Sequence, residues 1–334
     1  MAPSATSPGQ EEAVNLPNQT LISLRKTLTT ESEPLARRFR ALFSLKHLAC
    51  QPETPSCIPA ISAIAAGFAS PSALLKHELA YCLGQTKNLA AVPYLRAVLE
   101  DRAEDPMCRH ESAEALAAIG DVESLALLRK CRDDDQEEKV VRETCEISVA
   151  RIEWENSEER KLEKLRQSDF ASIDPAPPME TTATIDSLEK SLLDTAQPLF
   201  IRYRAMFGLR DLASPPSLPT AVQAVLALAK GLADPSALFR HEIAFVFGQL
   251  SHPASIPALS AALADLEESS MVRHEAAEAL GSLGEEEGVE ETLKKFLNDK
   301  EQVVRESVEV ALDMAEFEKS GQTEYALIPE ITAA

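Results

Sequence analysis

The sequence predicts an all-α protein, an α-solenoid of eight helical hairpins in two pseudo-symmetric halves. First, residues 23–120 match residues 187–284 at one constant offset of 164 residues without a gap. Second, each half contains two histidines that are 33 residues apart, which is the spacing of a helical hairpin repeat. Third, glycine is scarce (11 of 334 residues), and no segment alternates apolar and polar residues with the period of a strand. Hairpins that cannot bury their own apolar faces must stack on their neighbours.

Helix starts are marked inside the repeats. Ser70-Pro71, Asp105-Pro106 and Asp234-Pro235 each combine an N-cap residue with proline at the first helical position. Each dipeptide precedes an alanine- and leucine-rich run, so we expect two short helices in each unit and four units in each half.

The ends of the chain and the stretch between the halves differ from the repeats in composition. Residues 155–185 are first highly charged and then rich in proline and threonine, with little apolar area to bury. We therefore divide the chain into a disordered N-terminus (1–16), a first half of four helical pairs (17–154), a linker (155–185), a second half of four helical pairs (186–318) and a flexible acidic tail (319–334).

The charge balance narrows the class of partner. With 54 acidic and 33 basic residues, the formal net charge is −21, which disfavours nucleic acid and anionic membranes because both attract excess Lys and Arg. No apolar run reaches the roughly 18 to 20 residues that span a bilayer, and the N-terminus lacks the features of a signal peptide. All six cysteines lie in the first half without a CxxC pair, which is typical of reduced thiols. We expect a soluble monomer in the cytoplasm, with a nuclear pool also compatible.

Four of the six histidines are directly followed by glutamate, at equivalent positions in the two inner units of each half. On a helix, such neighbours can be aimed at one inner surface. The pairs are His77-Glu78, His110-Glu111, His241-Glu242 and His274-Glu275.

Small residues follow each of these histidines on the same helix face. The residue three positions later is alanine, and the residue seven positions later is glycine or alanine. These positions are Ala80, Ala113, Ala244 and Ala277, and Gly84, Ala117, Gly248 and Gly281. The pattern predicts open space above the polar groups.

Imidazole and carboxylate side chains together favour a metal centre. They bind iron, manganese or zinc, and two histidines with one or two glutamates supply three or four ligands in each half. Mixed nitrogen and oxygen ligation without thiolates favours iron that reacts with oxygen. Two alternatives stay open: a manganese or zinc hydrolase on the same ligands, and a non-catalytic adaptor whose His-Glu pairs cross-link repeats. A phycobilin-lyase-like repeat protein would leave the four His-Glu pairs unexplained.

The motifs KHELAYCLGQ, RHESAEALAAIG, RHEIAFVFGQ and RHEAAEALGSLG resemble those of the deoxyhypusine hydroxylases. The resemblance covers about residues 20–318 and implies HEAT-type repeats that hold two iron ions, ferrous in the resting enzyme. It also implies O2 as co-substrate and hydroxylation of the deoxyhypusine side chain on translation initiation factor 5A.

The resemblance also implies the roles of individual residues. The metal ligands would be His77, His110, Glu111, His241, His274 and Glu275. Glu78 and Glu242 match motif glutamates that act as further ligands or contact the substrate amine, and we favour the contact with the amine. A carboxylate-lined pocket and a net charge of −21 suit a cationic aliphatic side chain.

Overall fold

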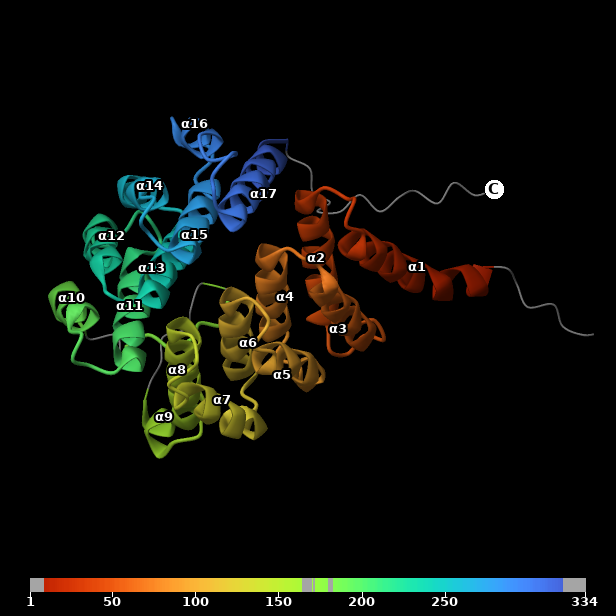
Figure 1. Cartoon of the computed structure of the whole chain (residues 1–334), viewed down its shortest axis with the longest axis horizontal. Helices are drawn as coiled ribbons and strands as arrows, with labels where there is room; N and C mark the ends of the chain where they lie inside the picture. Colours follow the sequence, from red (N-terminus) through yellow and green to blue (C-terminus); the bar gives the residue numbers. More distant parts are fainter. Residues whose placement is uncertain (1–8, 164–169, 171, 180–182, 321–334) are drawn as a thin grey trace, which may run out of the picture.

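The computed structural model describes residues 9–163, 170, 172–179 and 183–320 of the 334-residue chain. These residues form helices and connecting loops, with no strand among them, so the all-α prediction is confirmed. Matches at the repeat offset fall on equivalent helices of the two halves, which form eight helical hairpins (Figure 1). No described helix is long and apolar enough to cross a membrane.

The first half contains the helices α1 (Gly9–Thr29), α2 (Leu35–Ala49), α3 (Cys57–Ala65), α4 (Ala73–Gln85), α5 (Val92–Glu100), α6 (Pro106–Ile119), α7 (Leu125–Arg132) and α8 (Lys139–Glu155). The short helix α9 (Glu158–Leu162) follows. The second half contains α10 (Ile185–Leu193), α11 (Leu199–Ala213), α12 (Ala221–Ala229), α13 (Ala237–Leu250), α14 (Ile256–Ala264), α15 (Ser270–Gly281), α16 (Val289–Lys294) and α17 (Gln302–Ser320). Short 3-10 helices occupy Ala66–Ala69, Leu89–Ala91, Val122–Ser124, Lys230–Ala233 and Pro253–Ser255.

One predicted helix start is confirmed and two are displaced. Asp105 caps α6 and accepts a hydrogen bond of 2.8 Å from the backbone N–H of Met107, with Pro106 at the first helical position. In α4 and α13 the caps are Ser72 and Ser236, each two residues after the predicted cap. The prolines at these sites therefore precede the helices, and a serine hydroxyl satisfies the first free N–H groups.

A buried arginine joins the two helices of several hairpins. We call the first helix of each hairpin the outer helix and the second the inner helix. The arginine is the fourth residue of the inner helix. Its Nε donates to the carbonyl of the penultimate residue of the outer helix, which satisfies a free C-terminal carbonyl. The bonds are Arg38 to Leu28 (2.8 Å), Arg109 to Leu99 (3.1 Å), Arg202 to Leu192 (3.0 Å) and Arg273 to Leu263 (3.0 Å). Each of these arginines also pairs with an acidic side chain.

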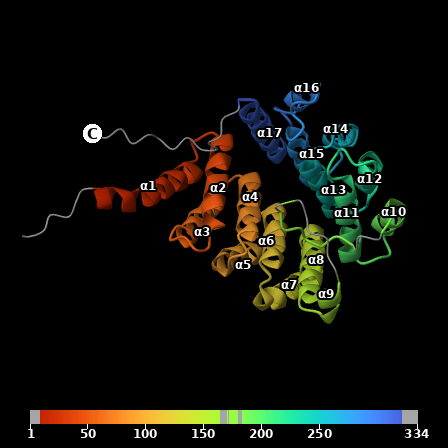
Figure 2. The same cartoon turned by 180° about the vertical axis from the view of Figure 1, so that it is seen from behind.

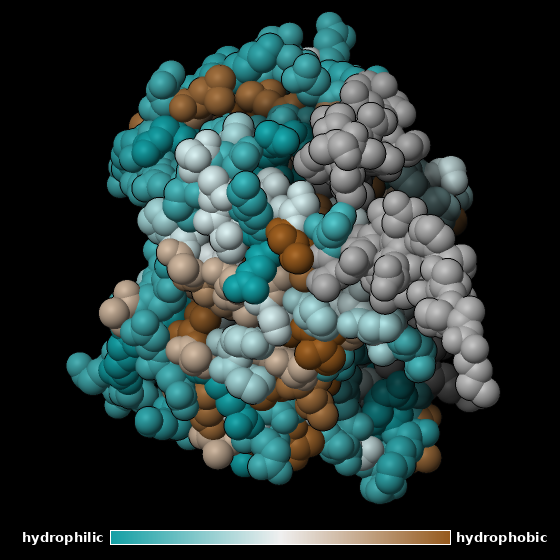
Figure 3. Space-filling model, turned by 90° about the vertical axis from the view of Figure 1, so that its right-hand side faces the viewer, coloured by the Kyte–Doolittle hydropathy of each residue, from teal (hydrophilic) through white to brown (hydrophobic). Residues whose placement is uncertain are grey.

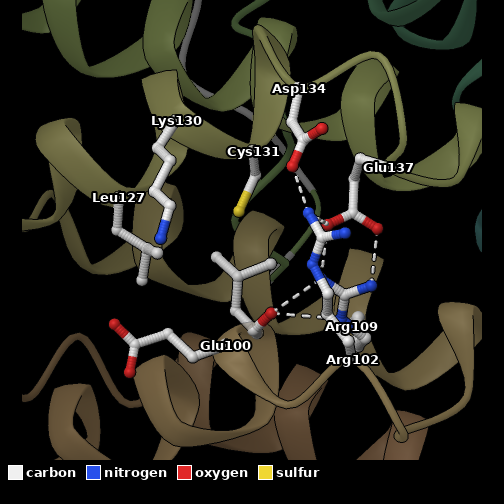
Figure 4. A pocket seen from close by; sticks show the side chains of 9 residues that line it. Glu100, Arg102, Arg109, Leu127, Lys130, Cys131, Asp134 and Glu137 are labelled. Atoms are coloured by element: carbon white, nitrogen blue, oxygen red, sulfur yellow. Dashed lines mark hydrogen bonds and ion pairs between the residues drawn. The ribbon is translucent and has the colours of Figure 1, made fainter.

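Figure 4 shows this arrangement in a cavity of about 140 Å³ beside α5, α6 and α7. Arg109 bonds Glu137 at 2.6 Å through both terminal nitrogens, and Arg102 pairs with Asp134. These charges are already used to join neighbouring hairpins, so this cavity has a structural explanation.

The two halves face each other through their inner helices. Figure 1 shows α4, α6 and α8 on one side and α11, α13 and α15 on the other, and Figure 2 shows the same arrangement from behind. The halves meet at both ends, where α8 contacts α11 and α17 contacts α2. The capping serines take part, because Ser72 donates to Glu306 of α17 and Ser236 donates to Glu143 of α8, both at 2.7 Å.

Each half has its own hydrophobic core, and each core receives side chains from the other half. Ile147 and Trp154 of α8 lie in the core of the second half, whereas Val310 of α17 lies in that of the first. The surface is mostly hydrophilic on the face shown in Figure 3, with hydrophobic side chains in small areas. The last helix of each half therefore stabilises the interface between the halves.

Part of the predicted linker is packed. Ile173 forms two backbone hydrogen bonds with the Gln85 side chain, of 2.8 and 3.4 Å, and Ser172 accepts one of 2.6 Å from Gln249. Asp174 pairs with the buried Arg210 at 2.8 Å. Residues 172–174 thus contact both halves, and we call them the strap.

The helices also extend beyond the predicted ends of the repeats. α1 begins at Gly9, inside the stretch 1–16 that we predict to be disordered, and α17 continues to Ser320. The predicted disorder of residues 1–8 and the predicted flexible tail at 321–334 lie outside the described residues.

Candidate metal centre

The four histidines of the His-Glu pairs meet at the centre of the molecule. His77 lies on α4, His110 on α6, His241 on α13 and His274 on α15, and all four are buried. In five of the six histidine pairs, the ring centroids lie 5.3 to 5.9 Å apart. The inner helices of both halves therefore contribute to one centre.

Two glutamates complete this centre in a symmetric way. Glu111 Oε2 lies 3.3 Å from His77 Nε2, and Glu275 Oε2 lies 3.3 Å from His241 Nε2. In each half, the carboxylate of one inner helix thus reaches the imidazole of the preceding one. Two groups of three could each hold a metal ion, with ligand atoms within 4.8 Å of one another: His77 with His110 and His241, and His241 with His274 and Glu275.

Several buried polar atoms of the centre lack a hydrogen-bond partner among the described residues. They include both ring nitrogens of His110, Nδ1 of His241, Nε2 of His274 and Oε1 of Glu242. An unsatisfied buried polar atom costs about 1 to 3 kcal/mol. A bound cation would satisfy these atoms, and imidazole with carboxylate is a ligand set for iron. The residues present therefore fit a metal centre.

The electrostatics of the centre point the same way. Burial lowers the pKa of His110 well below its usual value, and the neighbouring histidines add to this effect. Burial also lowers the pKa of His241, to about 3. Burial opposes protonation of His77, but its hydrogen bond to Glu111 and nearby carboxylates raise its pKa to about 9. His110 and His241 thus present neutral imidazoles, which is the form that binds metal, whereas His77 holds a proton near neutral pH that a bound cation would displace.

Glu78 and Glu242 lie beside the histidines but differ in exposure. Glu242 is buried, whereas Glu78 is partly exposed in the cavity. Burial and the nearby Glu278 carboxylate raise the pKa of Glu78 to about 8. Burial and Glu114 raise the pKa of Glu242 well above its usual range. Both carboxylates would be stabilised by a cation.

Two further glutamates of the site, Glu114 and Glu278, were not predicted. Glu278 Oε1 accepts a hydrogen bond of 3.0 Å from the Ser307 hydroxyl and lies 3.5 Å from Nδ1 of His274. Glu114 lies with His110 and Glu111 in a third group whose ligand atoms are within 4.8 Å. A signal was present in the sequence, because each follows its histidine by four positions on the same helix face.

The centre opens into a cavity of about 340 Å³, which we call the central cavity. Carboxylates and aromatic rings surround the cavity. The rings of Tyr81 and its repeat equivalent Phe245 lie edge to face, with their centroids 6.1 Å apart. Lys46 lies 5.0 Å above the Tyr81 ring. The lining residues are Phe43, Lys46, His77, Glu78, Tyr81, Glu111, Glu114, His241, Glu242, Phe245, Glu275 and Glu278.

The small residues that follow the histidines have another role than predicted. A Cβ atom on Gly84 would lie 2.8 Å from Ala115 of α6, and one on Gly281 would lie 2.7 Å from Ala311 of α17. Ala80 and Ala113 are fully buried in the core of the first half. Gly84, Ala80 and Ala113 thus allow adjacent inner helices to pack closely, and the prediction that they leave open space over the polar groups is wrong for these three, whereas Gly281 also lines a cavity.

Comparison with known proteins agrees with the repeat architecture and the site. The model of the HEAT repeats matches residues 58–150 and 225–313. A deoxyhypusine hydroxylase of Neurospora crassa is 72% identical over 318 residues, which cover 94% of this chain and 98% of the relative. The chain belongs to the deoxyhypusine hydroxylase family. It is therefore an enzyme of the oxidoreductase class.

Further members of the deoxyhypusine hydroxylase family support this assignment. The enzyme of Aspergillus fumigatus is 66% identical over 338 residues, which cover all of this chain and 99% of the relative. The structure of human deoxyhypusine hydroxylase in complex with glycerol superposes with a TM-score of 0.80 at 44% identity. It covers 91% of this chain and 99% of the human chain, so the HEAT-type solenoid of eight hairpins is confirmed.

Proposed function

We propose that this enzyme hydroxylates the deoxyhypusine side chain of translation initiation factor 5A with two iron ions and O2. The convergence of four buried histidines and their paired glutamates on one point carries this proposal. His77, His110 and Glu111 would hold one iron, and His241, His274 and Glu275 the other. When bound, the two ions would supply the redox chemistry that inserts an oxygen atom into an unactivated C–H bond, which side-chain acids and bases cannot do.

The chain's own residues would bind and orient the substrate. Glu242 has an unpartnered, buried Oε1, and Glu78 lies at the cavity end of the same centre. An ammonium group between these carboxylates would satisfy that oxygen and favour their charged forms. We infer that Glu78 and Glu242 position the substrate amine. The apolar rings of Phe43 and Phe245 would exclude water from the aliphatic chain between the amine and the reacting carbon.

The wider setting of the enzyme is part of the proposal. Six free cysteines, five of them buried, suit a reducing compartment, so we place the enzyme in the cytoplasm with a possible nuclear fraction. The net charge of −21 would favour a basic protein loop as the substrate carrier. We propose that it acts as a monomer, because each chain provides both ligand sets.

The test combines metal analysis with a product assay. We expect about two iron ions per chain after anaerobic reconstitution. With O2 and a reductant, the deoxyhypusine-bearing factor should gain the mass of one oxygen atom. A stable protein without bound metal that tolerates His-to-Gln changes would instead support an adaptor, and turnover with manganese or zinc but without O2 would support a hydrolase.

A further inference from the structure

The duplication predicts two equivalent mouths for the central cavity, one on each side of the pseudo-twofold axis. One mouth is present as a cavity of about 200 Å³ between α2 and α17. It shares Phe43, Glu78 and Glu278 with the central cavity, so it leads to the candidate metal centre. We call it the α2/α17 mouth, and its other lining residues are Phe39, Gly281, Ser282, Val310, Ala311 and Met314.

Among the described residues, side chains fill the equivalent region of the second half. Phe43 and Lys46 are partly exposed, whereas their repeat equivalents Phe207 and Arg210 are fully buried. Arg210 is held by Asp174 of the strap at 2.8 Å, and its guanidinium stacks at 4.3 Å over the ring of Phe170. A segment that has no repeat equivalent therefore fills this side.

The last helices of the two halves, α17 and α8, show the same difference. Met314 of α17 lines the α2/α17 mouth and is partly exposed. The helices α8 and α17 begin at Lys139 and Gln302, an offset of 163 residues, so the equivalent of Met314 is Arg151. Arg151 donates a hydrogen bond of 3.2 Å to the backbone oxygen of Asp174. The strap thus packs against Arg210 and Arg151 on one side, whereas apolar side chains line the mouth on the other side.

We propose that the deoxyhypusine side chain enters the enzyme through the α2/α17 mouth, with its aliphatic part against Phe43, Val310 and Met314. This inference rests on the proposed function and adds the direction of substrate entry. An aliphatic chain with a terminal ammonium group fits this passage, because apolar side chains line the mouth and carboxylates lie at its inner end. The first carboxylate that an entering ammonium group meets is Glu78 or Glu278, since these two are shared by both cavities.

A pair of charge changes at the mouth tests this route. Met314→Lys should repel the cationic side chain and raise the KM for a deoxyhypusine peptide about tenfold, whereas Met314→Glu should leave it unchanged or lower it. The matched controls are Leu226→Lys and Leu226→Glu on the exposed face of α12, which carry the same net charges. The two Leu226 variants should keep the wild-type kcat and KM, and all four variants should keep the wild-type iron content and helical circular dichroism.

A steric pair provides an independent test at the same residue. Met314→Trp should narrow the mouth and raise the KM more than Met314→Ala, which removes only the apolar contact of Met314. If both the Met314 and Leu226 series behave alike while the wild type hydroxylates the peptide, the proposed route is wrong.

Calorimetry with spermidine, an aliphatic polyamine, separates the two proposals. Weaker binding in Met314→Lys and Met314→Trp, but not in the Leu226 variants, would support the mouth even if no hydroxylation occurred. Such binding without any hydroxylation of the peptide would overturn the proposed function and leave the route of entry standing. Equal binding by all variants would overturn the route of entry.

Discussion

At the scale of single residues, the two halves of the site differ in how their second histidine is supported. His274 lies 3.5 Å from both Glu278 and Ser307, and these two side chains are hydrogen-bonded to each other at 3.0 Å. In the first half, Thr144 replaces Ser307 and bonds the carbonyl of Val140 in its own helix. Groups that hold the second nitrogen of a ligating histidine fix its orientation and raise its basicity.

We therefore predict that Glu278→Gln weakens metal binding by the second half about tenfold or more, with little change in folding. Glu114→Gln is the matched control, because Glu114 occupies the equivalent position and shows no bond to His110 in the described structure. Competition with a chelator would measure the metal retained per chain. Equal loss in both variants would contradict a supporting role specific to Glu278.

The histidines themselves give a stronger prediction. His77→Ala or His274→Ala should each remove most of the bound iron and of the hydroxylation activity, since each deletes a ligand from the centre. His47→Ala is the control, because His47 is exposed and its side chain hydrogen-bonds Gln51 rather than any residue of the centre. Unaltered iron content and turnover in the first two variants would refute the proposed ligand sets.

At the scale of elements, the strap joins parts of the chain that are far apart in sequence. The repeat-equivalent residues Gln85 and Gln249 bind adjacent positions of the strap, Ile173 and Ser172. Arg210, which is fully buried, pairs with Asp174 as well as with Asp211. The strap therefore contributes to the packing of the halves against each other.

Asp174→Ala should lower the free energy of unfolding by about 3 kcal/mol, because it leaves a buried guanidinium with one carboxylate fewer. Asp135→Ala, at an exposed turn, should change it by less than about 0.5 kcal/mol. Denaturant unfolding of the two variants would measure the difference. Equal stabilities would contradict a stabilising role of the Asp174–Arg210 ion pair.

The strap also shows the limit of prediction from sequence. The repeat offset predicts the helices and brings the four histidines, Glu111 and Glu275 to equivalent places, because these features recur in both halves. Residues 172–174 have no counterpart and little local propensity, and their order depends on contacts with Gln85, Gln249 and Arg210. Ser72 was missed as a cap for a related reason, since several residues near Pro71 can cap a helix.

At the scale of the whole molecule, the buried charges of the centre oppose the stability of the metal-free protein. The pKa of Glu275 is raised by burial and by the nearby Glu278 carboxylate from 4.5 to about 8, and that of Glu78 is also about 8. The pKa of His77 is about 9, above its usual 6.5. Groups with raised pKa values in the folded state stabilise it at low pH and lose this contribution as pH rises through those values.

The metal-free protein should therefore become less stable between pH 7 and pH 9. A bound cation favours the deprotonated ligands, so the rise in Tm caused by iron should increase over the same range. Thermal unfolding with a chelator and with ferrous iron under anaerobic conditions would measure both trends. A metal-free Tm that rises from pH 7 to pH 9 would contradict the buried state of these groups.

The contact between α17 and α2 has a consequence for synthesis of the chain. The first helix with a ligand histidine, α4, begins at Ala73, and the helix that closes the ring, α17, begins only at Gln302. A nascent chain on the ribosome would thus expose its inner carboxylates and histidines until nearly the last helix has emerged. The inner helices of the first half would stay uncovered until those of the second half had folded against them. Iron loading would therefore be a late, post-translational event in the maturation of the enzyme.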